Sequence, residues 1–598
     1  MPLSTADSPA TIALSFATRV AATTPDADGG ALAAYRPSSL ATPDYPWWQR
    51  LNPVHHALQR LALSRAKHPS LLGHPRIALR LSRLLPRYEY DPELAFGVDD
   101  APPDVVDRRR TGFEQLGARL REMAPRTLEA SGELRGAISD VDFVNAYRVP
   151  FQFRSLVENG LPVGSIAAAT DGPQISDLDG NWAYDLGGSY GVNLFGTEFY
   201  KRSIDRAVER ARDLGMVLGA YHPIIVENVE RLRAISGLDE VSFHMSGTEA
   251  VMQAVRVARY HTRRPAVVRF AGAYHGWWDG VQAGPGNPRP ARDVYTLAEM
   301  SERTLRVLAT RHDIACVLVN PIQAMHPNGA PPSDTSLVTG ERRAAYDKAA
   351  YAEWLHRLRD ACTARGIVLI FDEVFLGFRL AKGGVQEYFG VPADLVTYGK
   401  SLGGGLPVGV LCGRADLMRR FRESRAADVC FARGTFNAHP YVMTAMNEFL
   451  RHVDDPATRE TWDDIDARWN ARTAAINARF AKAKLPLRLA NMTSVWVTCF
   501  TEPGRYHWMY QYYLRATGIQ MGWIGTGRFI LSHDLTDDDI EQIGDRMLDA
   551  AEAMRTDGWF WRNPALSTKA IKRRILRESI SAARGRGSSG RSAHPARA

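Results

Sequence analysis

Short, continuous apolar runs alternate with amphipathic segments over the central part of the chain. The runs are rich in Val, Ile, Leu and Phe and end at polar or glycine-rich sequence, which is typical of buried parallel strands. They cover residues 267–270, 316–319, 367–371, 395–398 and 408–411. The segments between them include 246–259 and 346–365, where apolar residues recur at helical spacing. The alternation predicts an α/β domain with a large, mostly parallel sheet.

The flanking sequence follows other patterns. Helical periodicity dominates before residue 130, and beyond 445 predicted helices (455–484, 506–517, 537–555) alternate with strands at 494–500 and 528–532. A hairpin signal at 177–181 precedes the central domain. We therefore expect a smaller α+β domain beside the large one, and a helical N-terminal extension. The predicted division is 1–40 disordered, 41–149 helical extension, 150–195 N-terminal part of the small domain, 196–445 large domain, 446–560 C-terminal small domain and 561–598 basic disordered tail.

Composition narrows the class of protein. A chain of 598 residues with 45% hydrophobic and 23% charged content is typical of a soluble protein with more than one core. Its five cysteines form no CxxC pair, which predicts a reducing, cytoplasmic setting without disulfides or a zinc site. No apolar run reaches the roughly 18 residues of a membrane span. The net charge of +8 permits acidic partners, but the basic tail does not interleave aromatic residues with its basic ones, as a nucleic-acid site would.

The first candidate site lies in the segment 367–400. Asp372 ends one predicted strand and Lys400 follows the next, so both leave the same edge of a parallel sheet, where such sheets bind ligands. This is the layout expected of a pyridoxal phosphate (PLP) site. The amine would hold the cofactor and the carboxylate would keep the ring nitrogen protonated. The alternative is a solvated strand end and a surface lysine.

Three other segments carry candidate ligand contacts, each with a plainer alternative. Ser246, Gly247 and Thr248 begin a predicted helix, where an anion such as a cofactor phosphate binds, although Ser246 or Thr248 could serve only as its N-cap. Tyr274 follows a strand and could stack on a flat ring or belong to the core. The glycines of 184–196 allow close backbone approach to a ligand or mark tight turns.

Arg76, Arg80, Arg83 and Arg87 recur at the spacing of one helical stripe. The stripe could dock an acidic partner or a membrane surface. We favour an ordinary solvated face opposite Ile77, Leu81 and Leu84.

Five motifs in a fixed order carry a family resemblance: SGTEA, YHG, IFDEV with GFR, YGKSLGGGLPVG and GTFNAHP. Together they resemble the class III, fold-type I PLP aminotransferases over residues 150–555, and most of all glutamate-1-semialdehyde aminomutase and its relatives. GVNLFG, ADLVTYGK and QYYLR resemble a narrower group, the aminotransferases of polyketide, peptide and prodigiosin-type pathways.

The resemblance implies a role for each matching residue. Lys400 matches the cofactor-binding lysine and Asp372 the partner of the ring nitrogen, while Val374 would pack on the ring face opposite Tyr274. The cofactor set also includes Ser246, Gly247, Thr248, His275 and Thr435, and the substrate set comprises Ser189, Tyr190 and Arg528. Thr435 matches a threonine that reaches the neighbouring subunit's cofactor, which implies a homodimer. Arg528 matches an arginine that binds the donor carboxylate.

One segment departs from the pattern. The family commonly has EP(I/V)QGE where this chain has 320–325, so Met325 replaces the acidic residue that pairs with the substrate arginine in ω-amino-acid enzymes.

The resemblance implies an aminotransferase that moves an amino group from an amino-acid donor to an aldehyde or ketone, either an acyl chain or a carrier-bound intermediate of natural-product biosynthesis. An acyl carrier protein is then a candidate partner. One alternative is intramolecular transfer of the aminomutase type, and another is a non-catalytic homologue that keeps only the fold.

Overall fold

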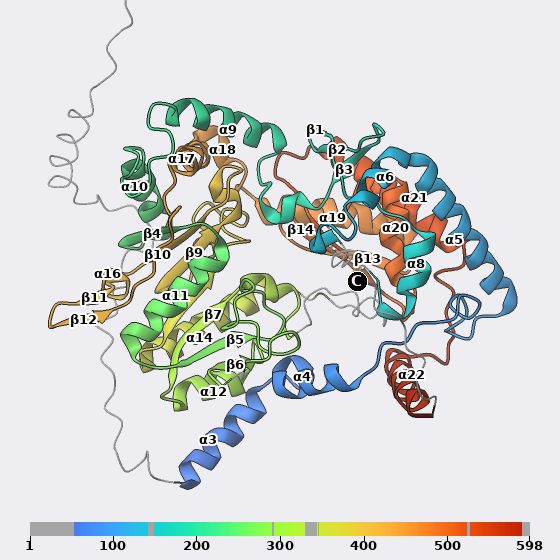
Figure 1. Ribbon diagram of the computed structural model, residues 1–598, viewed down its shortest axis with the longest axis horizontal. Helices are drawn as coiled ribbons and strands as arrows, with labels where there is room; N and C mark the ends of the chain where they lie inside the picture. Colours follow the sequence, from blue (N-terminus) through green and yellow to red (C-terminus); the bar gives the residue numbers. More distant parts are fainter. Residues whose placement is uncertain are drawn as a thin grey trace, which may run out of the picture.

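The computed structural model describes residues 53–141, 149–289, 292–328, 344, 346–522 and 527–588. The segment expected to be disordered, 1–40, lies outside this range. Figure 1 shows two domains side by side, with the large one on the left and the small one on the right. The blue N-terminal helices run beneath the large domain and continue along the far side of the small one.

The large domain is built on a seven-stranded sheet with the order β4-β10-β9-β8-β7-β5-β6. Neighbouring strands from β9 to β6 run parallel, whereas β10 is antiparallel to both of its neighbours. The predicted α/β fold with a mostly parallel sheet is confirmed. The strands are β4 (Glu240–His244), β5 (Ala266–Phe270), β6 (Val294–Leu297), β7 (Ile314–Val319), β8 (Val368–Asp372), β9 (Leu395–Gly399) and β10 (Gly409–Gly413).

Both faces of this sheet are covered, which explains the continuous apolar runs. In β8, Val368 and Ile370 belong to the hydrophobic cluster of α11, whereas Leu369 and Phe371 belong to the cluster of α14 and α17. A strand buried on both sides has no position left for a polar side chain. The helices of this domain are α9 (Thr197–Ala211), α10 (Ile225–Ser236), α11 (Gly247–Thr262), α12 (Glu302–Thr310), α14 (Lys348–Arg365), α15 (Gly384–Phe389), α16 (Ala415–Met418) and α17 (Pro440–Asp454).

The small domain contains strands from both ends of the family-like region. Its sheets have the orders β1-β2-β3-β15 and β13-β14-β16, and β3 pairs in parallel with β15. The strands are β1 (Ala169–Asp171), β2 (Gln174–Ser176), β3 (Trp182–Asp185), β13 (Leu487–Met492), β14 (Val495–Phe500), β15 (Ile519–Gln520) and β16 (Arg528–Ile530). The helices are α18 (Pro456–Arg459), α19 (Ile465–Lys482), α20 (Tyr510–Ala516) and α21 (Asp537–Thr556).

Two details of the small domain test sequence predictions. The single helix predicted over 455–484 is wrong, because α18 ends at Arg459 and α19 begins only after Asp464, whose φ of 49° is left-handed. The predicted start of α21 is confirmed: Thr536 and Asp539 form a reciprocal capping box.

The N-terminal extension is helical, as predicted, and contacts both domains. Helix α3 (Pro53–Ala66) packs on α12, and the amide of Ala298 donates to the carbonyl of Ala66 at 2.9 Å. Helix α5 (Pro103–Met123) packs on α20 of the small domain. The described part of the extension also contains α4 (Pro75–Leu84), α6 (Pro125–Glu133) and α8 (Arg154–Gly160). The extension therefore bridges the two domains on one side of the molecule (Figure 1).

The arginine stripe is shorter than predicted. Helix α4 ends at Leu84, so Arg87 lies beyond the helix and is not part of the stripe. Its side chain forms an ion pair with Glu89. Arg76, Arg80 and Arg83 remain on the helix and are exposed.

The C-terminal tail is also more ordered than predicted, since residues 568–588 form helix α22 (Thr568–Ser588). Glu578 of this helix accepts hydrogen bonds from the hydroxyls of Tyr88 and Tyr90 at 3.0 and 2.6 Å and pairs with Arg505 at 3.1 Å. One acidic residue thus anchors an otherwise basic segment. No described helix combines the length and apolar character that a bilayer crossing requires. All five cysteines are free and buried.

Candidate active site

Asp372 ends β8 at the carboxyl edge of the sheet, and its side chain is buried. Its Oδ2 lies 2.8 Å from Nδ1 of His275, and its Oδ1 accepts hydrogen bonds from the Val374 amide at 3.2 Å and the Thr397 hydroxyl at 3.4 Å. A carboxylate has about four lone-pair directions, so these contacts orient the group and leave room for one more donor. Nε2 of His275 is buried without a partner among the described residues.

Lys400 follows β9 at the same edge, and its mostly buried side chain carries the second reactive group. Burial lowers the pKa of its amine to about 8; the charge of Asp372 opposes this shift, while the charges of Arg379 and Arg528 add to it. Its φ of 48° is left-handed, a conformation that costs a lysine energy and that clusters at functional sites. The Nζ atom lies 4.7 Å from the ring centre of Phe375. The amine is thus held where its neutral, nucleophilic form is accessible near neutral pH.

Three glycines allow four chain segments to meet beside these groups. A Cβ on Gly247 would lie 2.4 Å from Cγ1 of Val374, and one on Gly399 would lie 3.3 Å from the same atom. A Cβ on Gly276, whose φ is 83°, would lie 2.5 Å from Oγ1 of Thr248. Such distances exclude any larger residue without displacement. The start of α11, the end of β8, the end of β9 and the loop after β5 therefore converge.

The N-terminus of α11 contributes amide groups to this region. The hydroxyl of Ser246 accepts from the amide of Glu249 at 3.3 Å, so Ser246 acts as the N-cap, the plainer of the two alternatives. Gly247 and Thr248 occupy the first turn, where amides have no partner within the helix and point outward. Their amides, together with the helix dipole, can bind a phosphate.

Arg379 is a residue that the sequence analysis quoted only within a motif. Its guanidinium is fully buried and donates to the carbonyls of Leu531 at 2.6 Å, Asn193 at 3.1 Å and Gly191 at 3.4 Å, and to the Ser494 hydroxyl at 2.9 Å. Burial lowers its pKa to about 10. The arginine thus fastens both halves of the small domain to the loop that follows β8. A Cβ on Gly191 would lie 3.7 Å from Cδ of Lys400, so this junction borders the lysine.

The other predicted residues are exposed or half-buried. Tyr274 is 58% exposed, and its carbonyl accepts from Asn320 at 3.2 Å. Ser189 and Tyr190 are exposed in a turn with φ values of 46° and 58°. Arg528 begins β16, and its positive charge helps to lower the pKa of Lys400. Thr435 lies in an exposed turn.

Met325, which replaces the last acidic residue of the family pattern, is buried in the core of the large domain. This position therefore supplies no charge to pair with Arg528.

The residues that converge fit PLP by their chemistry. The Lys400 amine has a lowered pKa, and the buried Asp372 carboxylate keeps one lone pair for a further donor. The N-terminus of α11 can bind a phosphate, and the apolar side chain of Val374 lies between two glycines. Comparison with known proteins decides the family, because the profile described as aminotransferase class-III matches residues 158–325 and 344–550, more than half of the chain. The chain belongs to the class III aminotransferase family. The enzyme is a PLP-dependent transaminase.

Individual relatives agree with the family. Glutamate-1-semialdehyde 2,1-aminomutase of Geotalea daltonii is 32% identical over 354 residues, which are 56% of this chain and 77% of the relative. An omega-transaminase from Sphaerobacter thermophilus has a similar structure, with 27% identity, a TM-score of 0.55 and coverage of 66% of this chain and 92% of its own. A transaminase with PLP bound has 25% identity and a TM-score of 0.56, covering 67% and 93%. The family match leaves out the helical extension before residue 158.

When bound, PLP supplies an electron sink that stabilises negative charge on the carbon bearing the amino group. In the arrangement found here, the Asp372 carboxylate would face the ring nitrogen and His275 would hold that carboxylate in place. Gly247 and Thr248 would bind the phosphate. The amine of Lys400 would take a proton from the substrate carbon and return one to the acceptor.

The lowered pKa of Lys400 predicts how the cofactor-free enzyme takes up PLP. Because only the neutral amine reacts, the rate of uptake should rise about tenfold per pH unit below 8 and level off above it. Asp372→Asn should move the midpoint to lower pH, since the Asp372 charge raises the pKa of Lys400. Stopped-flow absorbance of the bound cofactor measures the rate. A midpoint near the ordinary lysine value of about 10.4 would contradict the assignment.

Proposed function

We propose that the enzyme transfers an amino group from an amino-acid donor to an aldehyde or ketone carried on an acyl chain, free or tethered to a carrier, in a natural-product pathway. The observation that carries the transfer itself is the mostly buried Lys400, with its lowered pKa, beside the Asp372–His275 pair. The sequence motifs shared with assembly-line aminotransferases support the acyl acceptor. Arg528, whose charge reaches Lys400, would bind the donor carboxylate.

The decisive experiment separates the two half-reactions. Purified enzyme loaded with pyridoxamine phosphate is mixed with single acceptors: glutamate-1-semialdehyde, straight-chain aldehydes and carrier-bound β-ketoacyl groups. Absorbance reports consumption of the amino form of the cofactor, and each acceptor is then combined with several amino-acid donors. Turnover of acyl aldehydes or ketones only in the presence of a donor supports the proposal.

A second candidate function is the aminomutase reaction, in which one substrate serves as both donor and acceptor. The relatives named glutamate-1-semialdehyde 2,1-aminomutase favour it, with 31% to 35% identity. Turnover of glutamate-1-semialdehyde alone, without any external donor, would establish this reaction. A non-catalytic homologue is disfavoured because the lysine, the aspartate and the phosphate-binding turn are all present.

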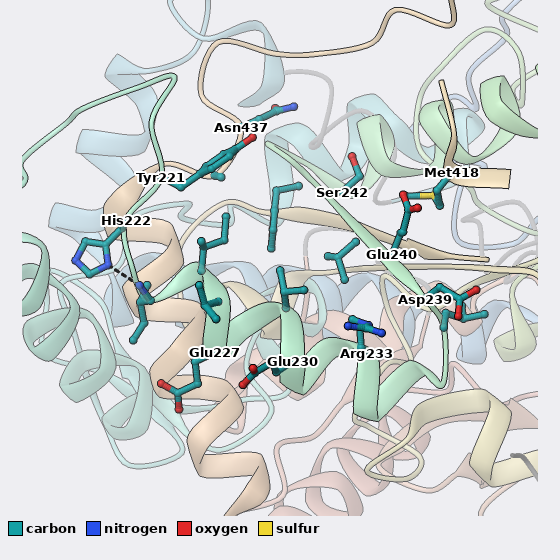
Figure 2. A pocket seen from close by; sticks show the side chains of 18 of the residues that line it. Tyr221, His222, Glu227, Glu230, Arg233, Asp239, Glu240, Ser242, Met418 and Asn437 are labelled. Carbon is teal, nitrogen blue, oxygen red and sulfur yellow. Dashed lines mark hydrogen bonds between the residues drawn. The ribbon is translucent and has the colours of Figure 1, made fainter. Parts of the chain in front are cut away.

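We also propose a homodimer, and two surface features support it. An open groove of about 1650 Å³ runs between α10, β4 and the turn that contains Asn437 (Figure 2). It exceeds the roughly 300–1,000 Å³ typical of small-molecule sites. The large hydrophobic residues Tyr221, Phe431 and Phe436 are exposed in or near it, as in a subunit contact. Thr435 lies in the same turn as Asn437 and would reach the partner's cofactor from there.

Mixed dimers test the role of Thr435. If the threonine acts across the interface, a dimer of one Lys400→Ala and one Thr435→Ala subunit contains one intact site. An equimolar mixture that exchanges subunits should then recover about a quarter of wild-type activity, since half of the dimers are mixed and each has one good site. Each parent variant alone should be much weaker. A mixture no more active than the average of its parents means that Thr435 acts within its own chain.

The proposal that a carrier protein docks on the enzyme is based on opposite charges of the two surfaces. Carrier proteins are typically acidic, whereas this chain has a net charge of +8, and Arg76, Arg80 and Arg83 project from α4. Replacing these three arginines by Ser should slow the reaction of carrier-bound substrates several-fold at low salt and leave free aldehydes unchanged. If the substitutions change the rates with carrier-bound and free substrates equally, the arginines form only an ordinary solvated surface and do not dock a carrier.

A further inference from the structure

A second, smaller groove separates the helical extension from the N-terminal strands of the small domain. Its volume is about 460 Å³, within the range of roughly 300–1,000 Å³ that small-molecule sites occupy. One wall comes from α5 and α6, and the other from β2, β3 and β15, which are neighbours in one sheet. The apolar side chains of the lining include Leu120, Met123, Leu128, Val163, Ile166 and Ile175.

This groove adjoins the active site through one turn of its lining. Ser189 and Tyr190 line it, and the next residue, Gly191, borders the side chain of Lys400. The carbonyl of Gly191 accepts from the hydroxyl of Ser401 and from Arg379, both at 3.4 Å. The turn that closes the groove is therefore fixed to the strand end that carries the lysine.

Three of the four charged groups of the lining are engaged by their own surroundings, and the fourth, Asp140, is exposed. Asp185 accepts from the amide of Gly187 at 3.0 Å, and burial raises its pKa, which favours the neutral acid. Asp177 accepts from the amides of Asp179 and Asn181 at 2.9 and 3.0 Å. Arg515 donates to the side chain of Gln520 at 2.8 Å. The remaining surface suits a hydrocarbon chain better than a second carboxylate.

We infer that this groove binds the apolar tail of the amino acceptor, with the carbonyl end at the turn beside Lys400. The inference rests on the proposed function and gives the enzyme a binding subsite for the acyl chain of the acceptor. Helices α5 and α6 lie outside the residues that match the family model. The wall that they form is therefore built by a segment outside the family match. The extension would thus select acceptors by chain length.

The test measures kcat/KM for straight-chain aldehydes of two to ten carbons with a fixed amino donor. Burial of each methylene should raise kcat/KM about threefold to fourfold until the groove is full. Leu128→Trp fills the groove and should remove this gain for long chains while leaving acetaldehyde unchanged. Leu94→Trp, at a residue 67% exposed outside the groove, should behave as the wild type.

A binding measurement gives a readout that does not depend on turnover. Calorimetry with 1-octanol should show binding with a negative heat-capacity change in the wild type and in Leu94→Trp, but not in Leu128→Trp. Equal kcat/KM for all chain lengths, together with no octanol binding, overturns the groove assignment but leaves amino transfer intact. If no aldehyde of any length accepts the amino group, the proposed function itself fails, and octanol binding then shows only an apolar groove.

Discussion

Lys400→Ala should lower transaminase activity by at least about a thousandfold, because the variant loses both the covalent attachment of PLP and the group that moves the proton. Borohydride treatment of the wild type should fix the cofactor on the peptide that contains Lys400, and the same treatment of the variant should fix none. Thermal unfolding of the cofactor-free variant should match or exceed that of the wild type, since the substitution removes a costly, mostly buried amine.

Two controls distinguish a chemical role from a structural one. Lys201→Ala removes an exposed lysine that pairs with Glu198 and should leave activity unchanged. Added ethylamine should restore a small, concentration-dependent rate to Lys400→Ala, because a diffusible amine can replace the missing proton carrier. A stable covalent adduct on the Lys400→Ala protein after borohydride would assign the attachment to another lysine.

The sequence predicts best those helices and strands that bury one face or both faces over several consecutive residues, because such burial leaves a regular apolar pattern. The sequence predicts strands β8 and β9 within two residues because sheet neighbours and two covering helices leave them mostly apolar positions. Their shared carboxyl edge then placed Asp372 and Lys400 together without any knowledge of side-chain contacts. Strands β4 and β6 were missed because they lie at the edges of the sheet, where partial exposure admits polar residues.

Contacts between residues far apart in the chain could not be predicted in the same way. The His275–Asp372 hydrogen bond joins positions 97 residues apart, and no periodicity encodes it. Arg379 resembled any charged residue near a loop, and only the structure shows its guanidinium buried among carbonyls of the small domain. The basic composition of residues 561–598 predicts disorder, whereas contacts with distant residues, Glu578 with Arg505 and Arg574 with Asp100, hold helix α22 in place.

Asp372→Asn tests whether the carboxylate acts through its charge. The amide has nearly the same shape: its oxygen, in the place of Oδ1, can accept from the Val374 amide, and its NH2 group, in the place of Oδ2, can donate to Nδ1 of His275 in the Nε2–H tautomer. It cannot hold a proton on the ring nitrogen, so the electron sink weakens while the site keeps its geometry. We expect PLP to remain bound, as judged by absorbance, and transamination to fall by at least about a hundredfold, the scale of lost electrostatic stabilisation in active sites.

Thr397→Val is the matched control for this variant. It deletes the long hydrogen bond at 3.4 Å from the Thr397 hydroxyl to Oδ1 of Asp372 and preserves the charge and the side-chain volume. Its activity should stay within about fivefold of wild type, since a hydrogen bond this long contributes at most about 1 kcal/mol. Similar losses in both variants would indicate that Asp372 serves mainly to position its neighbours. A hundredfold loss confined to Asp372→Asn, with PLP retained, would assign to this carboxylate the protonation of the ring nitrogen.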